Sequence, residues 1–142
     1  MVAVVIPLGL RNRNPGNIRP SNPPWQGAVG PNSGFVVFDT MANGIRALCK
    51  QLMVYQSKYG IRTVRDAISR WAPPTDHNDT EAYIVMVCTI LDCDDEDRFS
   101  FRDPDFLYWM VCAIGEQENG HRAFNENVTD AQIDAGIAAA LT

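Results

Sequence analysis

The strongest constraint on the fold is the segment "DPDFLYWMVCAIGEQENG" at residues 103–120. Over residues 106–114 the side chains are apolar on nearly every face that a helix would present. Asp103 is a suitable N-cap, Pro104 suits the first helical position, and Gly120 is typical of a helix end. A helix that is apolar all round is stable only when other elements surround it. The segment therefore predicts one central, buried helix around which the rest of the chain folds.

Four other stretches have apolar residues at helical spacing, so that with the central helix we expect about five helices. They cover residues 43–60, 63–71, 80–91 and 129–141. Thr63 and Thr129 are candidate N-caps, because Asp66 and Gln132 follow them at the three-residue spacing of a capping box.

The first forty residues differ in composition, because they contain six of the nine prolines. The apolar "GFVVFD" at 34–39 lies among turn residues, which is typical of a strand in a small sheet. We therefore expect an α+β, mostly helical chain that forms a single domain over residues 1–142. Its parts are an apolar N-terminal arm or strand at 1–10, loops with a small sheet at 11–40, and helices at 41–142.

The net charge of −5 argues against a general nucleic-acid binder and against adsorption to an anionic membrane, since both need a basic surface. The first ten residues, "MVAVVIPLGL", have only about half the ~20 apolar residues that a membrane-spanning helix needs. They also lack the basic region of a secretory signal peptide. The sequence thus predicts no nucleic-acid partner, no membrane span and no signal peptide.

Cysteine and histidine usage predicts neither a metal site nor a cofactor. The chain has four cysteines without a CxxC pair, and it has two histidines. Cys49, Cys88 and Cys112 lie in apolar helical patterns, where thiols are usually buried and reduced. The acidic "DCDDEDR" at 92–98 lacks the spacing of an EF-hand loop.

Two glutamates follow the apolar run of the central helix. With Met110 at the centre of the apolar face, a step of about 100° per residue puts Glu116 on the opposite side and Glu118 at the margin. A carboxyl at the margin is partly desolvated, which raises its pKa, and the general acid of glycoside cleavage needs such a carboxyl. The alternative is that both glutamates only solvate the end of the helix.

A second polar stretch, "RNRNPGNIR" at 11–19, contains three asparagines, three arginines and a Pro-Gly pair. The Pro-Gly pair suits a type II turn, and the amides of Asn14 and Asn17 either brace that turn or bind a ligand. Trp25 follows in "WQG". An aromatic ring beside amides suits a carbohydrate, although a single tryptophan equally suits an ordinary core position.

The motifs "RNRNPGNIR", "WQG", "GFVVFD", "WAPP", "NDT", "YI" and "ENG" occur in this order within about residues 8–122. In this combination the chain resembles a family of bacteriophage peptidoglycan-degrading and virion-associated proteins with a lysozyme-like fold. It is more loosely similar to bacterial cell-wall glucosaminidases, with the glutamate segment moved from first to last as in a circular permutation. The resemblance implies a lysozyme-like domain in which the turn at 11–19 lines a cleft opposite Glu118.

The resemblance also implies roles for single residues. Glu118 would be the general acid, with Glu116 as the alternative if the helix is overwound at its end. Tyr83 would position or polarise the attacking group. The residues that the resemblance assigns to glycan binding are Asn14, Asn17, Trp25, Asp79 and Thr80. Arg13 stands where the family usually has an asparagine.

A second carboxylate is not clearly placed by the motifs, and the candidates are Asp39, Asp76 and Asp79. A lytic transglycosylase needs no second carboxylate, because the 6-hydroxyl of the sugar closes the ring. The lack of a clearly placed second carboxylate favours a transglycosylase or a single-carboxylate glycosidase over a two-carboxylate hydrolase.

The expected function is therefore cleavage of peptidoglycan glycan strands by a bacteriophage enzyme at host entry or lysis. The resemblance places it in the virion, with other virion proteins as further partners, and its action in the host periplasm and cell wall. Two alternatives remain open, a murein endopeptidase of the same fold and a non-catalytic virion structural protein. The absence of an HExxH motif argues against a zinc endopeptidase.

Overall fold

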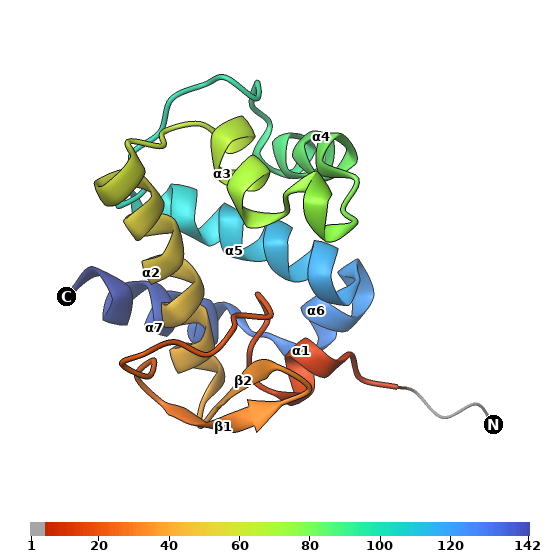
Figure 1. Cartoon of the computed structure of the whole chain (residues 1–142), viewed down its shortest axis with the longest axis vertical. Helices are drawn as coiled ribbons and strands as arrows, with labels where there is room; N and C mark the ends of the chain where they lie inside the picture. The colour runs from red at the N-terminus through yellow and green to blue at the C-terminus, as the bar shows by residue number, and fades with distance from the viewer. Residues whose placement is uncertain (1–4) are drawn as a thin grey trace.

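The structure, a computed structural model, describes residues 5–142. A short helix α1 (Leu8–Arg11) precedes the strands β1 (Ala28–Asn32) and β2 (Phe35–Phe38). The helices that follow are α2 (Met41–Tyr59), α3 (Val64–Trp71), α4 (Thr80–Leu91), α5 (Pro104–Asn119), α6 (His121–Asn127) and α7 (Asp130–Leu141), with a 3₁₀ turn at Pro74–Asp76. Figure 1 shows the sheet at one end of the molecule, α3 and α4 at the other, and α5 between them. The predicted α+β, mostly helical class is confirmed.

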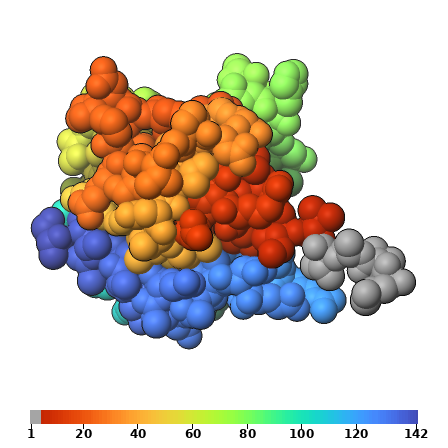
Figure 2. Space-filling view, turned by 90° about the horizontal axis from the view of Figure 1, so that it is seen from below, coloured from red at the N-terminus to blue at the C-terminus, as the bar shows by residue number. Residues whose placement is uncertain are grey.

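The N-terminal part of the chain forms a small layer of its own. The two strands are antiparallel, and Val36 and Phe38 of β2 pack with Ile18 and Ala47 in a second, smaller core. Figure 2 shows this part, in red and orange, seated on the blue C-terminal helices. The predicted small sheet is thus confirmed, and it holds the segment 11–19 against the helices.

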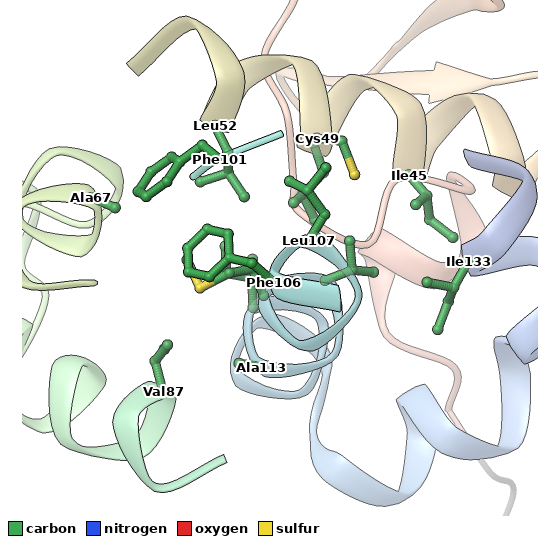
Figure 3. Packing of buried hydrophobic residues seen from close by; sticks show 14 of the residues in the cluster. Ile45, Cys49, Leu52, Ala67, Val87, Phe101, Phe106, Leu107, Ala113 and Ile133 are labelled. Carbon is green, nitrogen blue, oxygen red and sulfur yellow. The ribbon is translucent and has the colours of Figure 1, made fainter. Parts of the chain in front are cut away.

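Helix α5 is the central helix that its apolar run predicts. Leu107, Met110 and Ile114 are completely buried. Figure 3 shows Leu107 at the centre of the core, with Cys49 of α2 and Ile133 of α7 close to it. The remaining sides of α5 pack against α4 and α6. The helix is therefore rigidly held along its length, which fixes whatever its C-terminal turn carries.

The helix ends follow local signals in the sequence. Asp103 and Thr63 cap α5 and α3 with their side chains, and Thr129 forms a complete capping box with Gln132 at the start of α7. Gly60 ends α2 in the left-handed conformation with a φ of 67°. The bounds of the five predicted helices agree with the structure within two residues, because caps and apolar periodicity are both local properties.

Two short helices depart from the prediction. Helix α1 lies inside the segment expected to be an arm or strand, so that residues 8–11 are helical instead of extended. Residues 1–4 of that arm lie outside the described residues. Helix α6 follows α5 directly after Gly120. These helices have four and seven residues, too few to show apolar periodicity, and the prediction of about five helices was therefore too low.

The four cysteines are free thiols, and Cys49 is completely buried. Burial raises the pKa of the Cys49 thiol to about 12, which makes it a poor nucleophile. Among residues 5–142 no three His, Cys, Asp or Glu side chains come together as a group that could hold a metal. No helix in the same part of the chain has the length and apolar character needed to cross a bilayer.

Candidate functional site

The turn that follows α1 is built around a buried asparagine. Asn14 is 0% exposed, and its Nδ2 donates to the backbone oxygens of Ile18 and Val36, each at 2.9 Å. Its Oδ1 accepts from the Ile18 N–H at 2.8 Å. Asn14 therefore joins the turn to β2 and offers no N–H to a ligand. The expectation that Asn14 contacts the glycan is corrected by this burial, because its part is structural.

The Pro-Gly pair lies at the tip of a turn. A hydrogen bond from the backbone N–H of Asn17 to the backbone oxygen of Asn14, at 3.0 Å, closes this turn. The φ of Gly16 lies outside the left-handed region, so the turn is not the predicted type II. The left-handed residue is Asn17, with a φ of 51°. A Cβ on Gly16 would lie 3.0 Å from Cδ1 of Leu48 and 3.2 Å from a ring carbon of Trp71. Close packing thus explains this glycine.

The end of α5 is fastened to the turn through the residue after Glu118. Asn119 is 7% exposed, and its Nδ2 donates to the backbone oxygens of Pro15 and Gly115, each at 2.9 Å. Gly9 of α1 lies against the same contact, because a Cβ there would be 2.6 Å from Oδ1 of Asn119. The "ENG" motif therefore supplies a structural amide beside its glutamate.

The carboxyl of Glu118 faces the turn and α4. Nδ2 of Asn17 donates to its Oε1 at 3.3 Å, and the hydroxyl of Tyr83 donates to its Oε2 at 3.2 Å. Both bonds are long for their type, so they orient the carboxyl without fully saturating it. The segment 11–19 thus faces Glu118, as the resemblance implies, and the structure also brings Tyr83 to the same carboxyl.

The environment of Glu118 favours its protonated form. Burial raises the pKa of this half-buried carboxyl above its ordinary value, while the hydrogen bonds from Asn17 and Tyr83 lower it, and burial dominates. Burial and the charge of Glu118 together raise the pKa of Tyr83, so its hydroxyl is neutral and remains a donor. A carboxyl that keeps its proton to higher pH beside a neutral donor has the properties of a general acid.

Glu116 points to a different part of the molecule. Its Oε1 lies 2.8 Å from Nδ1 of His121 and accepts from Nδ2 of Asn125 at 2.8 Å. It therefore links α5 to α6 and does not line the cleft that Glu118 lines. Since α5 is α-helical up to Asn119, the overwound end that would exchange the two glutamates is not observed. Glu116 as the alternative acid is corrected accordingly.

A cleft of about 1120 Å³ opens beside Glu118. Residues 16–21 with Trp25 form one wall, and residues between 69 and 78 form the other, together with the end of α2. In Figure 2 the orange loop before β1 and the green segment at the start of α4 protrude on the same side, with a dip between them. The volume exceeds that of most small-molecule sites, and it suits an extended ligand such as an oligosaccharide.

The structure separates the predicted binding residues into two groups. Asn17 and Trp25 line the cleft, as predicted. Asp79 and Thr80 do not, because Asp79 accepts from the Ala82 N–H as the cap of α4 and the Thr80 hydroxyl donates to a backbone oxygen at 2.6 Å. The "NDT" motif therefore fixes the start of the helix that carries Tyr83, and the glycan-binding role expected for its two residues is corrected.

Among the candidates for a second carboxylate, Asp76 alone lines the cleft. Asp39 instead accepts a hydrogen bond from Asn43 at 2.8 Å, and Asp79 is the cap described above. Asp66 of α3 also lines the cleft, although its sequence position indicates only a helix cap. Within residues 5–142 neither Asp66 nor Asp76 is hydrogen-bonded to Glu118.

Three aromatic residues that line the cleft were not predicted as site residues, and the first of them is Phe35 of β2. Tyr55 and Trp71 also line the cleft, with their ring centroids 6.4 Å apart in an edge-to-face arrangement. Tyr55 follows the apolar spacing of α2 and is therefore assigned to the core from sequence alone. Trp71 opens the "WAPP" motif, and a tryptophan next to two prolines at a helix end was the available signal.

No family model matches the chain. The chain is similar to a bacteriophage protein, Protein P5 of Pseudoalteromonas phage PM2, with 40% identity over 84 residues. The matched segment covers 56% of this chain and 52% of that protein, so the chain spans about half the length of the curated relative it matches. The similarity connects the chain to a phage protein, and the relative's name states no activity.

Proposed function

We propose that this chain cleaves the glycan strands of bacterial peptidoglycan for a bacteriophage, with Glu118 as the general acid. The observation that carries the proposal is the half-buried carboxyl of Glu118, held by Asn17 and Tyr83 at the side of an open cleft. Trp25 and Trp71 supply rings in the same cleft on which sugars stack. The similarity to a phage protein supports the biological setting.

In the first step protonated Glu118 donates its proton to the glycosidic oxygen. The bond between that oxygen and C1 of the preceding sugar breaks, and the oxygen leaves as a hydroxyl. Burial supports this step, because it keeps Glu118 protonated at a pH where an exposed glutamate is ionised. Asn17 and Tyr83 then donate hydrogen bonds to the carboxylate that remains.

In the second step the carboxylate of Glu118 accepts the proton of the 6-hydroxyl of the same sugar. The oxygen of that hydroxyl forms a bond with C1, which gives a 1,6-anhydro end and returns Glu118 to its protonated state. This route uses neither water nor a second carboxylate. This single-carboxylate route fits the site. Asn17 and Tyr83 hold the carboxyl of Glu118, whereas Asp66 and Asp76 line the cleft without a hydrogen bond to it.

The test is a digest of purified peptidoglycan, with the soluble products identified by mass spectrometry. We expect the wild type to release 1,6-anhydro-muropeptides and Glu118→Gln to release them about 10²–10⁴-fold more slowly, the usual share of a general acid. Glu116→Gln is the matched control, because it makes the same change on the same helix outside the cleft. It should keep nearly full activity.

Other products would change the proposal in defined ways. Muropeptides with free reducing ends would replace the transglycosylase by a hydrolase that uses a water, with Asp66 or Asp76 as the second carboxylate. New free amino termini would identify an endopeptidase. Intact peptidoglycan with all three proteins would overturn the enzymatic proposal and leave a phage structural protein.

A further inference from the structure

Two arginines line the cleft without an acidic partner. Arg19 follows the turn on one wall, and Arg70 precedes Trp71 on the other. In the described part of the chain, the ion pairs of arginine are formed by Arg65 and Arg122 and by neither of these two. Arg19 and Arg70 are distinguished by their place, because they are the basic side chains among the described residues that line the cleft.

Aromatic rings hold both guanidinium groups in place. The Cζ of Arg70 lies 3.7 Å from the ring centroid of Tyr59 and 5.7 Å from that of Tyr55. The Cζ of Arg19 lies 5.0 Å from the ring centroid of Phe35. Stacking fixes the plane of a guanidinium and leaves its N–H groups free for a bidentate acceptor. The two walls therefore present oriented donors for carboxylate or phosphate groups.

The sugar backbone of the proposed substrate offers these arginines no negatively charged group. The hydroxyl and acetamido groups of a glycan strand are uncharged, and they suit the amides and aromatic rings nearer to Glu118. The carboxylates of peptidoglycan are found on the peptide stems that branch from alternate sugars. A glycan strand that lies along the cleft directs its peptide stems towards the walls of the cleft.

We propose that Arg19 and Arg70 bind the carboxylates of the peptide stems, so that this protein selects stem-bearing glycan over bare glycan. The inference rests on the proposed function for the identity of the strand, and it adds the chemical feature by which that strand is recognised. The guanidinium fork suits this role because it forms two parallel hydrogen bonds with one carboxylate.

The test measures binding, so that it is independent of cleavage. Glu118→Gln protein is titrated by calorimetry with soluble glycan strands that carry their stems and with N-acetylglucosamine oligomers of similar length, which are bare strands without any carboxylate. We expect the stem-bearing strands to bind about tenfold more tightly or better, as for hydrogen bonds to charged groups. The advantage should shrink as salt is added, since both arginines are exposed.

Arg19→Gln with Arg70→Gln, in the same Glu118→Gln background, should bind both kinds of strand alike. Arg62→Gln with Arg98→Gln is the matched control, because it removes the same charge from exposed residues outside the cleft. Arg70→Lys keeps the charge but loses the fork, and we expect it to retain only part of the preference. Thermal melting of each variant checks that it is folded.

If the Glu118→Gln protein with both arginines intact binds the two kinds of strand with equal affinity, the inference is overturned. It is also overturned if that protein binds neither strand. A control pair that removes the preference as fully as Arg19 and Arg70 do would also overturn it, since the effect would then be one of net charge. A clear preference for stem-bearing strands with no product from the wild type would uphold the inference and overturn the proposed cleavage.

Discussion

Two polar segments of this chain differ in burial. The segment 11–19 and the segment 92–98 are both short, rich in polar residues and largely without regular structure. In the first, residues 14–16 are buried, and the side chain of Asn14 and the backbone oxygen of Pro15 are paired inside the protein. The second is mostly exposed, and its internal bonds, such as the one from the Asp94 N–H to Asp97, lie at the surface.

The difference shows which polar side chains can be buried as part of the fold and which stay at the surface. Amides can satisfy backbone groups in the interior, and the first segment has three asparagines and one proline in nine residues. Carboxylates are costly to bury without partners, and the second segment has five acidic residues in seven. Arg65 contacts Asp95 and Glu96 of this segment at the surface, and Cys93 packs against the core.

The largest effect is expected where the first segment touches α2. A Cβ on Gly44 would lie 1.8 Å from the backbone oxygen of Arg13, so Gly44→Ala forces the turn away from the helix. We expect it to lower the free energy of unfolding by about 4 kcal/mol, measured by urea denaturation. Gly60→Ala, where the Cβ meets nothing within 4 Å, should cost only about 1 kcal/mol for its left-handed φ. Equal losses would contradict the close docking of the turn.

The next effect compares the two polar segments directly. Asn14→Ala leaves the Ile18 N–H and the Val36 oxygen without their partner in the interior, and we expect a loss of about 3 kcal/mol. Asp97→Ala removes one exposed acceptor and should cost less than about 0.5 kcal/mol. Similar values for both variants would show that the buried segment is no more structural than the exposed one.

The smallest effect concerns the charge of Glu118 beside the turn, and its size depends on pH. Because the folded pKa of Glu118 is raised, stability is greatest below the unfolded pKa and falls as the pH rises through the folded pKa. Glu118→Gln avoids this loss, so its Tm should exceed that of the wild type by about 2–4 °C at pH 7. The gain should vanish below about pH 4, where the wild type is protonated too. A gain that is equal at both pH values would show that charge is not its cause.

Local sequence features predicted most of this fold. Capping residues and apolar spacing placed the five long helices, and the all-round apolar run identified α5 as the centre. The resemblance added the pairing of the segment 11–19 with Glu118, which no periodicity could supply because the bonded residues are 101 positions apart.

What the sequence left out depends on where side chains point after packing. Asn14 and Asn17 are the same residue type in one motif, yet one is buried in backbone contacts and the other reaches Glu118. Asp79 and Thr80 were expected in the cleft but were used at the start of α4. Trp71 and Arg70 enter the cleft because α3 ends beside it, which only the three-dimensional structure reveals.

The span between Asn17 and Glu118 has a consequence for the order of synthesis. A nascent chain makes its turn early, but the glutamate and Asn119 emerge about 5–20 s later at usual rates of translation. Until then Asn17 has no partner on α5, and a chain that stops before residue 110 has no site at all. The site therefore cannot assemble before Glu118 and Asn119 have been made.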